Sequence, residues 1–310
     1  MVGGRVVATQ FSGQRSFVDD SWLTGSGSVV REPGDGVAAP RSFAEMPWPK
    51  VSVVIPTLNE ARNLPYVFSK LPPALHEVII VDGRSVDDTV ATARRLRPGV
   101  RIVTQSRSGK GNALACGFAA ATGDIIAMVD ADGSADPGEI PAFVEALLGG
   151  ADYAKGSRFA AGGGSSDITR LRSAGNRVLS GLVNLLCGTR YSDLCYGYNA
   201  FWRRHVPVFG LDADAPAAAD GTRLWGDGFE VETLINIRVA QAGLKVAEVA
   251  SYEHPRIHGV SNLNAASDGW RVLRTILVER FRCSKQRSGP APAAGQPARQ
   301  PAPEPVSRPR

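Results

Sequence analysis

The sequence predicts an α/β fold with a mostly parallel central sheet flanked by helices, and three observations lead to this prediction. Short runs rich in β-branched residues alternate with segments of helical composition. The central runs are apolar without interruption, as expected for strands that are buried on both faces of a sheet. Polar clusters follow three of these runs, and the carboxyl ends of parallel strands are where such sheets bind ligands.

The strands and helices are predicted in chain order. Strands are predicted at 51–55, 77–81, 101–104 and 125–129. Two helices show apolar residues at i, i+3, i+4 and i+7, namely Leu64, Val67, Phe68 and Leu71, and Ile140, Phe143, Val144 and Leu147. After Tyr153 the pattern changes, and helices are predicted from about Thr169 to Leu186 and from about Gly228 to Ala242. We expect this second half to be mixed α/β and to form the far wall of a cleft.

One folded domain is predicted at 50–282 of the 310 residues, of which 43% are hydrophobic. Residues 1–49 are rich in Gly, Ser and Pro without sustained periodicity, so they are predicted to be disordered or extended. Residues 283–310 form a tail rich in Pro, Ala and Arg that is also predicted to be disordered. This tail carries most of the net charge of +5, so the charge gives no support for a nucleic-acid partner.

The sequence also predicts where the protein is located. No apolar run approaches the roughly 20 residues of a membrane-spanning helix, and no secretory signal peptide is recognised. The four cysteines lie far apart, without the close pairs of a metal or redox motif. We therefore expect a cytoplasmic protein. Residues 268–282 form an amphipathic basic helix, which can either pack against the domain or lie on the inner face of the cell membrane.

Asp130 and Asp132 directly follow the predicted strand at 125–129. Both carboxylates can therefore reach one point beyond the edge of the sheet. Carboxylate oxygens are preferred ligands of hard divalent cations, so the pair predicts a metal site. A D-x-D triplet alone fits a solvated turn equally well, and it is the position after a buried strand that favours the metal.

Other polar residues stand at the neighbouring strand ends. Asp82 follows the strand at 77–81, where it can bind a base or ribose or simply belong to a turn. Asp88 has the spacing of a helix capping box with Ser85, and it can also contact a ligand. The glycine-punctuated segment 106–114 offers backbone N–H groups and Lys110 to an anion, with a structural turn as the alternative.

Six segments together resemble the inverting family 2 glycosyltransferases with the GT-A fold. Within that family the resemblance is to the dolichol-phosphate mannose synthase-like, or polyprenyl-phosphate glycosyltransferase, group. The segments are 53–60, 81–88, 109–114, 129–132, 156–158 and 259–263. They stand in the family's order over about 210 residues. The resemblance therefore implies the GT-A nucleotide-diphospho-sugar transferase fold and a glycosyl transfer reaction.

The resemblance implies a nucleotide-diphospho-sugar held by the first half of the chain. The implied donor-binding residues are Pro56, Asn59, Glu60, Asp82, Asp88, Lys110, Asp130, Arg256 and Ser261. Asp130 and Asp132 would hold Mg2+ or Mn2+ on the diphosphate, where the ion neutralises charge on the leaving group. Ser134 stands where lipid-phosphate members often have Gln and would be a further metal ligand.

On the acceptor side, the resemblance implies transfer of a hexose from a GDP-mannose or UDP-glucose type donor to polyprenyl phosphate. Arg158 matches a family arginine near the acceptor phosphate. Arg170 or Arg172 can join it, although both also fit a solvated helix face. A phosphomonoester already carries an anionic oxygen at neutral pH and needs no general base.

Three alternatives remain open. A hydroxyl acceptor on a glycan or secondary metabolite would need a carboxylate base, for which Asp227, Glu230 and Glu232 are candidates. For Glu230, an exposed helix position is the expected alternative. A nucleotidyltransferase would be expected to carry a glycine-rich loop after the first strand, and this chain does not. A nucleotide-sugar-binding protein without catalysis is disfavoured because Asp130, Asp132 and Arg158 are all present.

Overall fold

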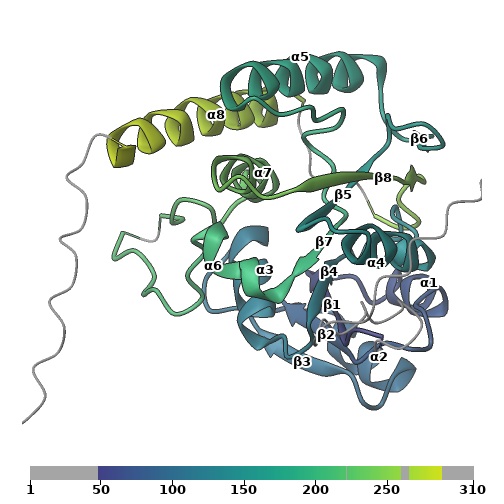
Figure 1. Cartoon of the computed structure of the whole chain (residues 1–310). Coiled ribbons are helices and arrows are strands. Elements are labelled where there is room, and N and C mark those ends of the chain that lie inside the picture. Colours follow the sequence, from purple (N-terminus) through teal and green to yellow (C-terminus); the bar gives the residue numbers. More distant parts are fainter. Residues whose placement is uncertain (1–47, 221, 260–264, 288–310) are drawn as a thin grey trace, which may run out of the picture. The chain divides into compact units, whose positions relative to one another are not determined.

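The computed structural model describes residues 48–220, 222–259 and 265–287, without the side chains of 265–268 and 283–287. They form a seven-stranded sheet in the order β3-β2-β1-β4-β7-β5-β8 and a two-stranded ribbon of β6 and β9 (Figure 1). The strands are β1 Val51–Thr57, β2 Glu77–Asp82, β3 Arg101–Thr104, β4 Ile125–Met128, β5 Tyr153–Ser157, β6 Gly164–Ser165, β7 Asn199–Trp202, β8 Val246–Ala250 and β9 Tyr252–Glu253. Only β7 among them is antiparallel to its neighbours, which confirms the predicted mostly parallel sheet.

Helices at 64–69 and 140–148 fall where the apolar periodicity predicts them, and those at 170–187, 231–241 and 265–287 overlap the other predicted ranges, whereas the short helix at 206–209 was not predicted. They are α1 Leu64–Ser69, α2 Thr89–Leu96, α3 Lys110–Ala120, α4 Ile140–Leu148, α5 Arg170–Cys187, α6 Val206–Phe209, α7 Val231–Gln241 and α8 Ala265–Arg287. The final helix continues to Arg287, past the domain end predicted at 282. Within the part of the chain that the structure describes, no helix could cross a bilayer. The rest of the predicted tail, the predicted N-terminal segment up to residue 47, and Ser261 lie outside the described residues.

Two hydrophobic cores cover the two faces of the sheet. Successive side chains of a strand point to opposite faces, so Val53 packs with α1, α2 and α4, whereas Val54 packs with α3, α6 and α7. Gly117 lets α3 lie close to the sheet, since a Cβ there would stand 2.3 Å from a methyl carbon of Val54. The strands are therefore buried on both faces, as their uninterrupted apolar sequence predicts.

A third core lies between α7 and an outer layer formed by α5 and α8. Val183 of α5, Ile237 of α7 and Ile276 of α8 meet there. Figure 1 shows α5 and α8 lying side by side across α7. Because α7 packs against the sheet on one side and this layer on the other, it is buried nearly all round.

The carboxyl ends of β1, β2 and β4 meet at one edge of the sheet. The loops after β1 and β2 are tied together there, because the N–H of Asn59 donates to Ser85 Oγ at 2.9 Å and Asn59 Oδ1 accepts from the N–H of Val86 at 2.8 Å. The predicted capping box of Ser85 and Asp88 does not form. Asp88 makes no side-chain cap, and Asp87 Oδ1 accepts the N–H of the first residue of α2 instead.

Candidate active site

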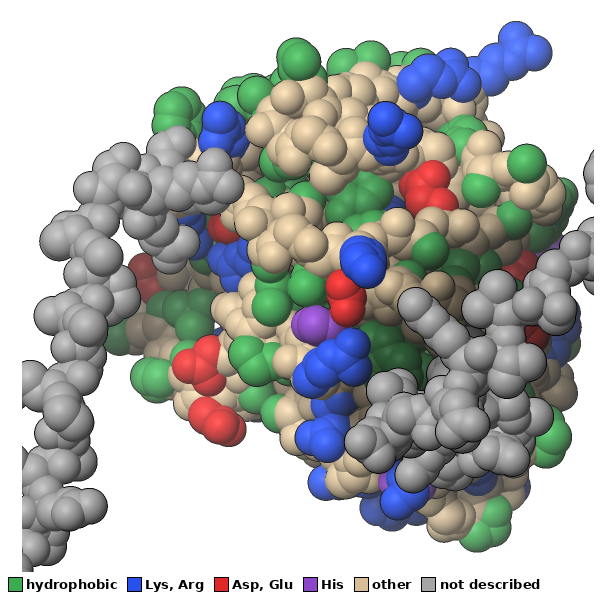
Figure 2. Space-filling model, viewed as in Figure 1, with side chains coloured by type: hydrophobic (Ala, Val, Ile, Leu, Met, Phe, Trp, Pro, Cys, Tyr) green, Lys and Arg blue, Asp and Glu red, His purple; other side chains and the backbone are tan. Residues whose placement is uncertain are grey.

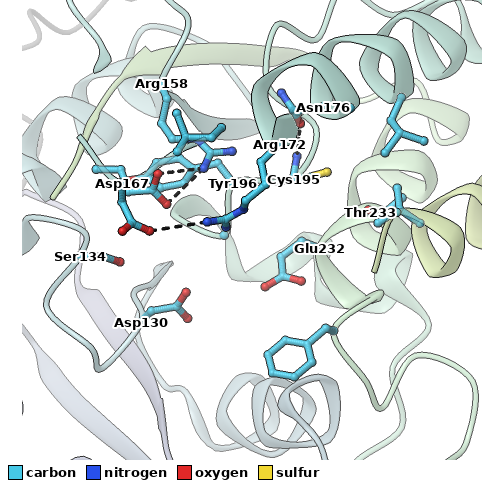
Figure 3. A pocket seen from close by; sticks show the side chains of 18 of the residues that line it. Asp130, Ser134, Arg158, Asp167, Arg172, Asn176, Cys195, Tyr196, Glu232 and Thr233 are labelled. Atoms are coloured by element: carbon cyan, nitrogen blue, oxygen red, sulfur yellow. Dashed lines mark hydrogen bonds and ion pairs between the residues drawn. The ribbon is translucent and has the colours of Figure 1, made fainter. Parts of the chain in front are cut away.

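A cavity of about 490 Å3 lies next to the carboxyl end of β4, and both halves of the chain line it. Figure 3 shows the side chains of Asp130, Arg172 and Glu232 pointing into the same space. The charged residues in its lining are Lys110, Asp130, Asp132, Arg158, Asp167, Arg172, Glu232, Glu253, Arg256 and Arg271. The far wall predicted for the second half of the chain is thus supplied mainly by α5, α7 and α8.

Lys110 joins the two sides of the cavity. Its Nζ lies 2.7 Å from Asp130 Oδ1 and 2.6 Å from Glu232 Oε1. Burial by itself would lower the pKa of the ammonium, but the two carboxylates outweigh it and raise the pKa above its usual value. Lys110 is therefore a permanent cation that links α3, the end of β4 and α7. The contact with Glu232 has no local sequence signal, and sequence reasoning missed it.

Asp132 is held by a second cation. Its Oδ1 accepts hydrogen bonds from the N–H and Oγ of Ser134, at 3.0 and 2.8 Å. Its Oδ2 lies 3.1 Å from Nη2 of Arg256, whose Nη1 lies 3.4 Å from Glu60 Oε1. Burial raises the pKa of Glu60, and the hydrogen bond from Asn63 and the charge of Arg256 only partly offset this. Arg256 thereby connects the loops that follow β1 and β4.

Asp130 and Asp132 fit a metal ion whose remaining ligands come from the substrate. Among the described residues, no group of three His, Cys, Asp or Glu side chains could hold a metal. Mg2+ is usually bound in nucleotide sites by one or two carboxylates together with substrate phosphates. Asp130 and Asp132 supply that number of carboxylates, and the Ser134 hydroxyl orients one of them.

Arg158 is fixed in the cavity wall by two carboxylates that sequence reasoning did not single out. Its Nε and Nη2 donate to both oxygens of Asp193, at 2.7 and 3.0 Å, and its Nη1 donates to Glu253 at 3.0 Å. Burial raises the pKa of Asp193, but the hydrogen bond and charge of Arg158 hold it below its usual range. The hydrogen-bond donors that the expected acceptor phosphate would use are therefore largely occupied.

Asp227 does not line the cavity. Its carboxylate accepts from Nε and Nη2 of Arg107, at 2.8 and 2.9 Å, and both side chains are buried. Its carbonyl oxygen also accepts from the N–H of Gly111, which fastens this loop to the start of α3.

The expectation that Glu230 is exposed is wrong. Glu230 is buried, and its Oε1 accepts the N–H groups of Gly226 and Gly228. The geometry thus leaves Glu232 as the candidate base.

The remaining predicted residues divide into two groups. Pro56, Asn59, Asp82 and Asp88 lie at the carboxyl ends of β1 and β2 or in the loops that follow them, as Glu60 does, and none of them lines the cavity. Arg172 lines the cavity and pairs with Asp167 at 3.6 Å. By contrast, Arg170 is exposed at the first position of α5 and does not line the cavity.

The cavity has an apolar half that sequence reasoning also missed. Its lining there includes Ile168, Leu171, Leu179, Phe229 and Val272. Leu171 and Leu179 stand eight residues apart on α5, and Gly175 lies between them. This i, i+4, i+8 spacing on one helix face was the available signal. Without α8 beside it, however, the spacing could not distinguish a cavity wall from an exposed face.

Comparison with known proteins identifies the class. Residues 52–207 match the family described as Glycosyl transferase family 2. An uncharacterized glycosyltransferase of Mycobacterium tuberculosis is 31% identical over 236 residues, which cover 72% of this chain and 97% of that protein. The chain therefore belongs to glycosyl transferase family 2, as the six segments predict.

Two further relatives have names that specify an acceptor. A dolichol-phosphate mannosyltransferase of Pyrococcus furiosus is 39% identical over 224 residues, 69% of this chain and 59% of that protein. An undecaprenyl-phosphate mannosyltransferase of Micrococcus luteus is 30% identical over 252 residues, 77% of this chain and 99% of that protein.

A solved structure shares the fold. Glucosyl-3-phosphoglycerate synthase from Mycobacterium tuberculosis, in complex with Mn2+, uridine diphosphate and glucosyl-3-phosphoglycerate, superimposes with a TM-score of 0.57 at 25% identity. The match covers 75% of this chain and 80% of that one. It confirms the predicted GT-A fold.

Replacing Lys110 with methionine should lower kcat/KM by at least about tenfold, because Asp130 and Glu232 would lose their shared cation and a hydrogen bond to a charged group contributes about 1.5–3 kcal/mol. Steady-state kinetics with a labelled donor would measure this. Lys70→Met is the matched control, since Lys70 pairs with Asp136 at the surface and should leave the rate unchanged. Full activity in Lys110→Met would show that the bridge has no part in turnover.

Proposed function

We propose that this chain transfers a hexose from a GDP-mannose or UDP-glucose type donor to polyprenyl phosphate, with inversion at the anomeric carbon. The observation that carries the proposal is the two-part cavity. It is charged beside Asp130 and Asp132 and apolar between α5 and α8. A polyprenyl phosphate has the matching parts, a phosphate and a hydrocarbon chain. The names of the Pyrococcus furiosus and Micrococcus luteus relatives support this acceptor.

On the donor side, the ends of β1, β2 and β4 bind the nucleotide-sugar. The nucleoside would lie against Pro56, Asn59, Glu60, Asp82 and Asp88, and the diphosphate against Lys110 and Arg256. Asp130 and Asp132, with Ser134, would hold Mg2+ or Mn2+. Such an ion supplies charge neutralisation for the departing nucleoside diphosphate. The Mn2+ and uridine diphosphate in the solved structure of similar fold support this assignment.

On the acceptor side, an anionic phosphate oxygen attacks the anomeric carbon. A bond forms between that oxygen and the carbon, the bond from the carbon to the nucleoside diphosphate breaks, and no proton has to be removed. Arg172 is the better candidate for the phosphate, because its pairing with Asp167 at 3.6 Å is long and partly exposed. Arg158 adds a fixed positive group to the same wall, compensated by Asp193 and Glu253.

A hydroxyl acceptor is the second candidate, and the glucosyl-3-phosphoglycerate in the solved structure favours it. That reaction needs a base, and Glu232 is the carboxylate in position. The substitution Glu232→Gln distinguishes a phosphate acceptor from a hydroxyl acceptor. It should reduce the rate only about tenfold with a phosphate acceptor, through its contact with Lys110, but about 100-fold to 10,000-fold with a hydroxyl acceptor. Rates measured with both acceptors on one preparation would decide between them.

The function itself is tested by incubating the protein with radiolabelled GDP-mannose or UDP-glucose, with and without polyprenyl phosphate, followed by organic extraction. We expect label in the lipid phase only when polyprenyl phosphate and Mg2+ or Mn2+ are both present, and none when EDTA removes the ion. Donor consumption without labelled lipid, or label on phosphoglycerate, would contradict the proposal and favour the hydroxyl acceptor.

A further inference from the structure

Arg107 is a buried arginine that stands shortly before Lys110 in the chain and does not line the cavity. Its Nε and Nη2 donate to the two carboxylate oxygens of Asp227 at 2.8 and 2.9 Å. Nη2 also donates to the carbonyl oxygen of Asp212 at 2.7 Å, and Nη1 donates to that of Ala215 at 2.6 Å. The guanidinium therefore ties the start of α3 to two parts of the chain between α6 and α7.

The chain between α6 and α7 turns backbone carbonyl groups toward Arg107 and most of its carboxylates toward solvent. Asp212, Asp214 and Asp220 are exposed. Figure 2 shows acidic side chains at the surface on the left of the molecule, where Figure 1 places this segment. Asp227 differs from them, because it is 4% exposed. A buried carboxylate without a counter-charge is strongly unfavourable, so Asp227 depends on Arg107 for its place in the interior.

The two segments that this ion pair joins are also in direct backbone contact on both sides of Lys110. The N–H of Gly111 donates to the carbonyl oxygen of Asp227 at 2.8 Å. Gly109 has a φ of 119°, which glycine adopts without strain, and a Cβ on it would overlap the same oxygen. A Cβ on Gly111 would overlap the carbonyl oxygen of Gly226. Lys110 therefore stands between two glycines whose backbone rests on the segment that leads into α7.

This backbone contact sets the distance between Lys110 and Glu232. Lys110 belongs to α3 and Glu232 to the first turn of α7, and Nζ and Oε1 lie 2.6 Å apart. The same ammonium lies 2.7 Å from Asp130 Oδ1. Asp227 shortly precedes Glu232 in the chain, so the segment that Arg107 holds also determines where α7 begins. A change in the spacing of the two segments would move Lys110 and Glu232 apart.

We propose that Arg107 and Asp227 are positioning residues for glycosyl transfer. Their buried ion pair holds α3 against the start of α7 and thereby keeps the Lys110 ammonium between Asp130 and Glu232. Displacement of a group in the site by about 1 Å can cost about 100-fold in rate, so the pair affects turnover without touching substrate. The inference rests on the proposed function, because it takes Lys110 and Glu232 to act in turnover. It gives Asp227 a role other than that of a base.

Arg107→Met and Asp227→Asn should each lower kcat about tenfold to 100-fold, with whichever acceptor supports turnover in the wild type. In the Lys110→Met background, Arg107→Met should cause no further loss of kcat, although it should still lower the urea midpoint of unfolding. Steady-state rates, at a temperature where circular dichroism shows each variant folded, would measure this. Asp227→Asn is the milder change, because its amide oxygen can still accept from Arg107, and it takes the place of Arg107→Met if that variant does not fold.

Arg238→Met is the matched control. Arg238 of α7 likewise donates two hydrogen bonds to one buried carboxylate, that of Glu279, at 2.9 and 3.1 Å. It also donates to the carbonyl oxygens of Phe209 and Gly210, and it does not line the cavity. Its replacement should lower the urea midpoint and leave kcat unchanged.

The Lys110 side chain gives a second readout that does not depend on activity. The sequence has six lysines, namely Lys50, Lys70, Lys110, Lys155, Lys245 and Lys285. Labelling the lysine Cε atoms with 13C therefore gives few NMR signals, and the Lys110 signal is the one that Lys110→Met removes. We expect Arg107→Met and Asp227→Asn to shift this signal, because the ammonium leaves Glu232, and Arg238→Met to leave it in place.

An unmoved Lys110 signal in Arg107→Met would overturn the inference, and so would a loss of kcat as large in the Lys110→Met background as in the wild type. Full activity in Lys110→Met would also overturn it, because the position of Lys110 would then have no consequence. A loss in Asp227→Asn that Arg107→Met does not share would restore Asp227 as a base. The proposed acceptor fails on a different outcome, wild-type turnover without labelled lipid, and the same variants then test the positioning role with a hydroxyl acceptor.

Discussion

Asp132→Asn should reduce glycosyl transfer by about a thousandfold or more while the protein stays folded. The substitution removes one of the two carboxylates that fit a metal ion. It also replaces the charged partner of Arg256 at 3.1 Å, which leaves Arg256 with the longer ion pair to Glu60 at 3.4 Å. Charge stabilisation of a leaving group of this kind contributes several kcal/mol to the transition state, and each 1.36 kcal/mol is about tenfold in rate. Initial rates at saturating donor, with thermal unfolding followed in parallel, would measure both parts of the expectation.

Asp136→Asn provides the comparison. Asp136 stands on the same loop after β4, but it pairs with Lys70 at the surface and does not line the cavity. Its loss should leave the rate unchanged and should cost less than about 1 kcal/mol of unfolding free energy. If Asp132→Asn kept more than a tenth of the activity and still responded to EDTA, the ion would have to be held elsewhere.

The fold was largely predictable because its signals are local. An uninterrupted apolar run is enough to predict a strand buried on both faces, and β1, β2 and β4 each contain such a run. Asp130 and Asp132 could be placed for the same reason, since they directly follow one of those strands. The helix at 170–187 was also predictable, but its apolar residues occupy two faces, and spacing alone could not show which face the core would cover.

The ion pairs of the site were not predictable, because each joins distant segments. Asp227 and Glu232 stand close together in the sequence and are both carboxylates. Asp227, however, forms a buried ion pair with Arg107 away from the cavity, whereas Glu232 pairs with Lys110 in the cavity lining. Only the packing of α3 against α7 decides between them. The ion pairs of Arg158 were not predictable either. The resemblance to the family indicates an acceptor phosphate near this residue but does not indicate the carboxylates that surround it.

Arg158→Met should cost about 3–5 kcal/mol of unfolding free energy, which is the penalty for removing one partner of a buried ion pair. Asp193 is fully buried and would keep its charge without the guanidinium, with only the backbone N–H of residue 158 still donating to it, and Glu253 would lose its contact at 3.0 Å. Urea unfolding followed by circular dichroism measures the loss. Arg172→Met is the control, because its pair with Asp167 is partly exposed and should contribute less than about 1 kcal/mol.

The pH dependence of the stability loss in Arg158→Met distinguishes two roles of Arg158, a structural ion pair in the cavity wall and binding of the acceptor phosphate. In the wild type the pKa of Asp193 is lowered, so the stability that the pair contributes is present above the usual aspartate pKa of about 3.8 and is lost as the pH falls through the lowered value. In Arg158→Met the unpaired buried carboxylate is relieved by protonation instead. The difference in unfolding free energy should therefore shrink on acidification. If it stays constant, or if Arg158→Met raises the acceptor KM with stability unchanged, the guanidinium serves the acceptor phosphate and not the wall.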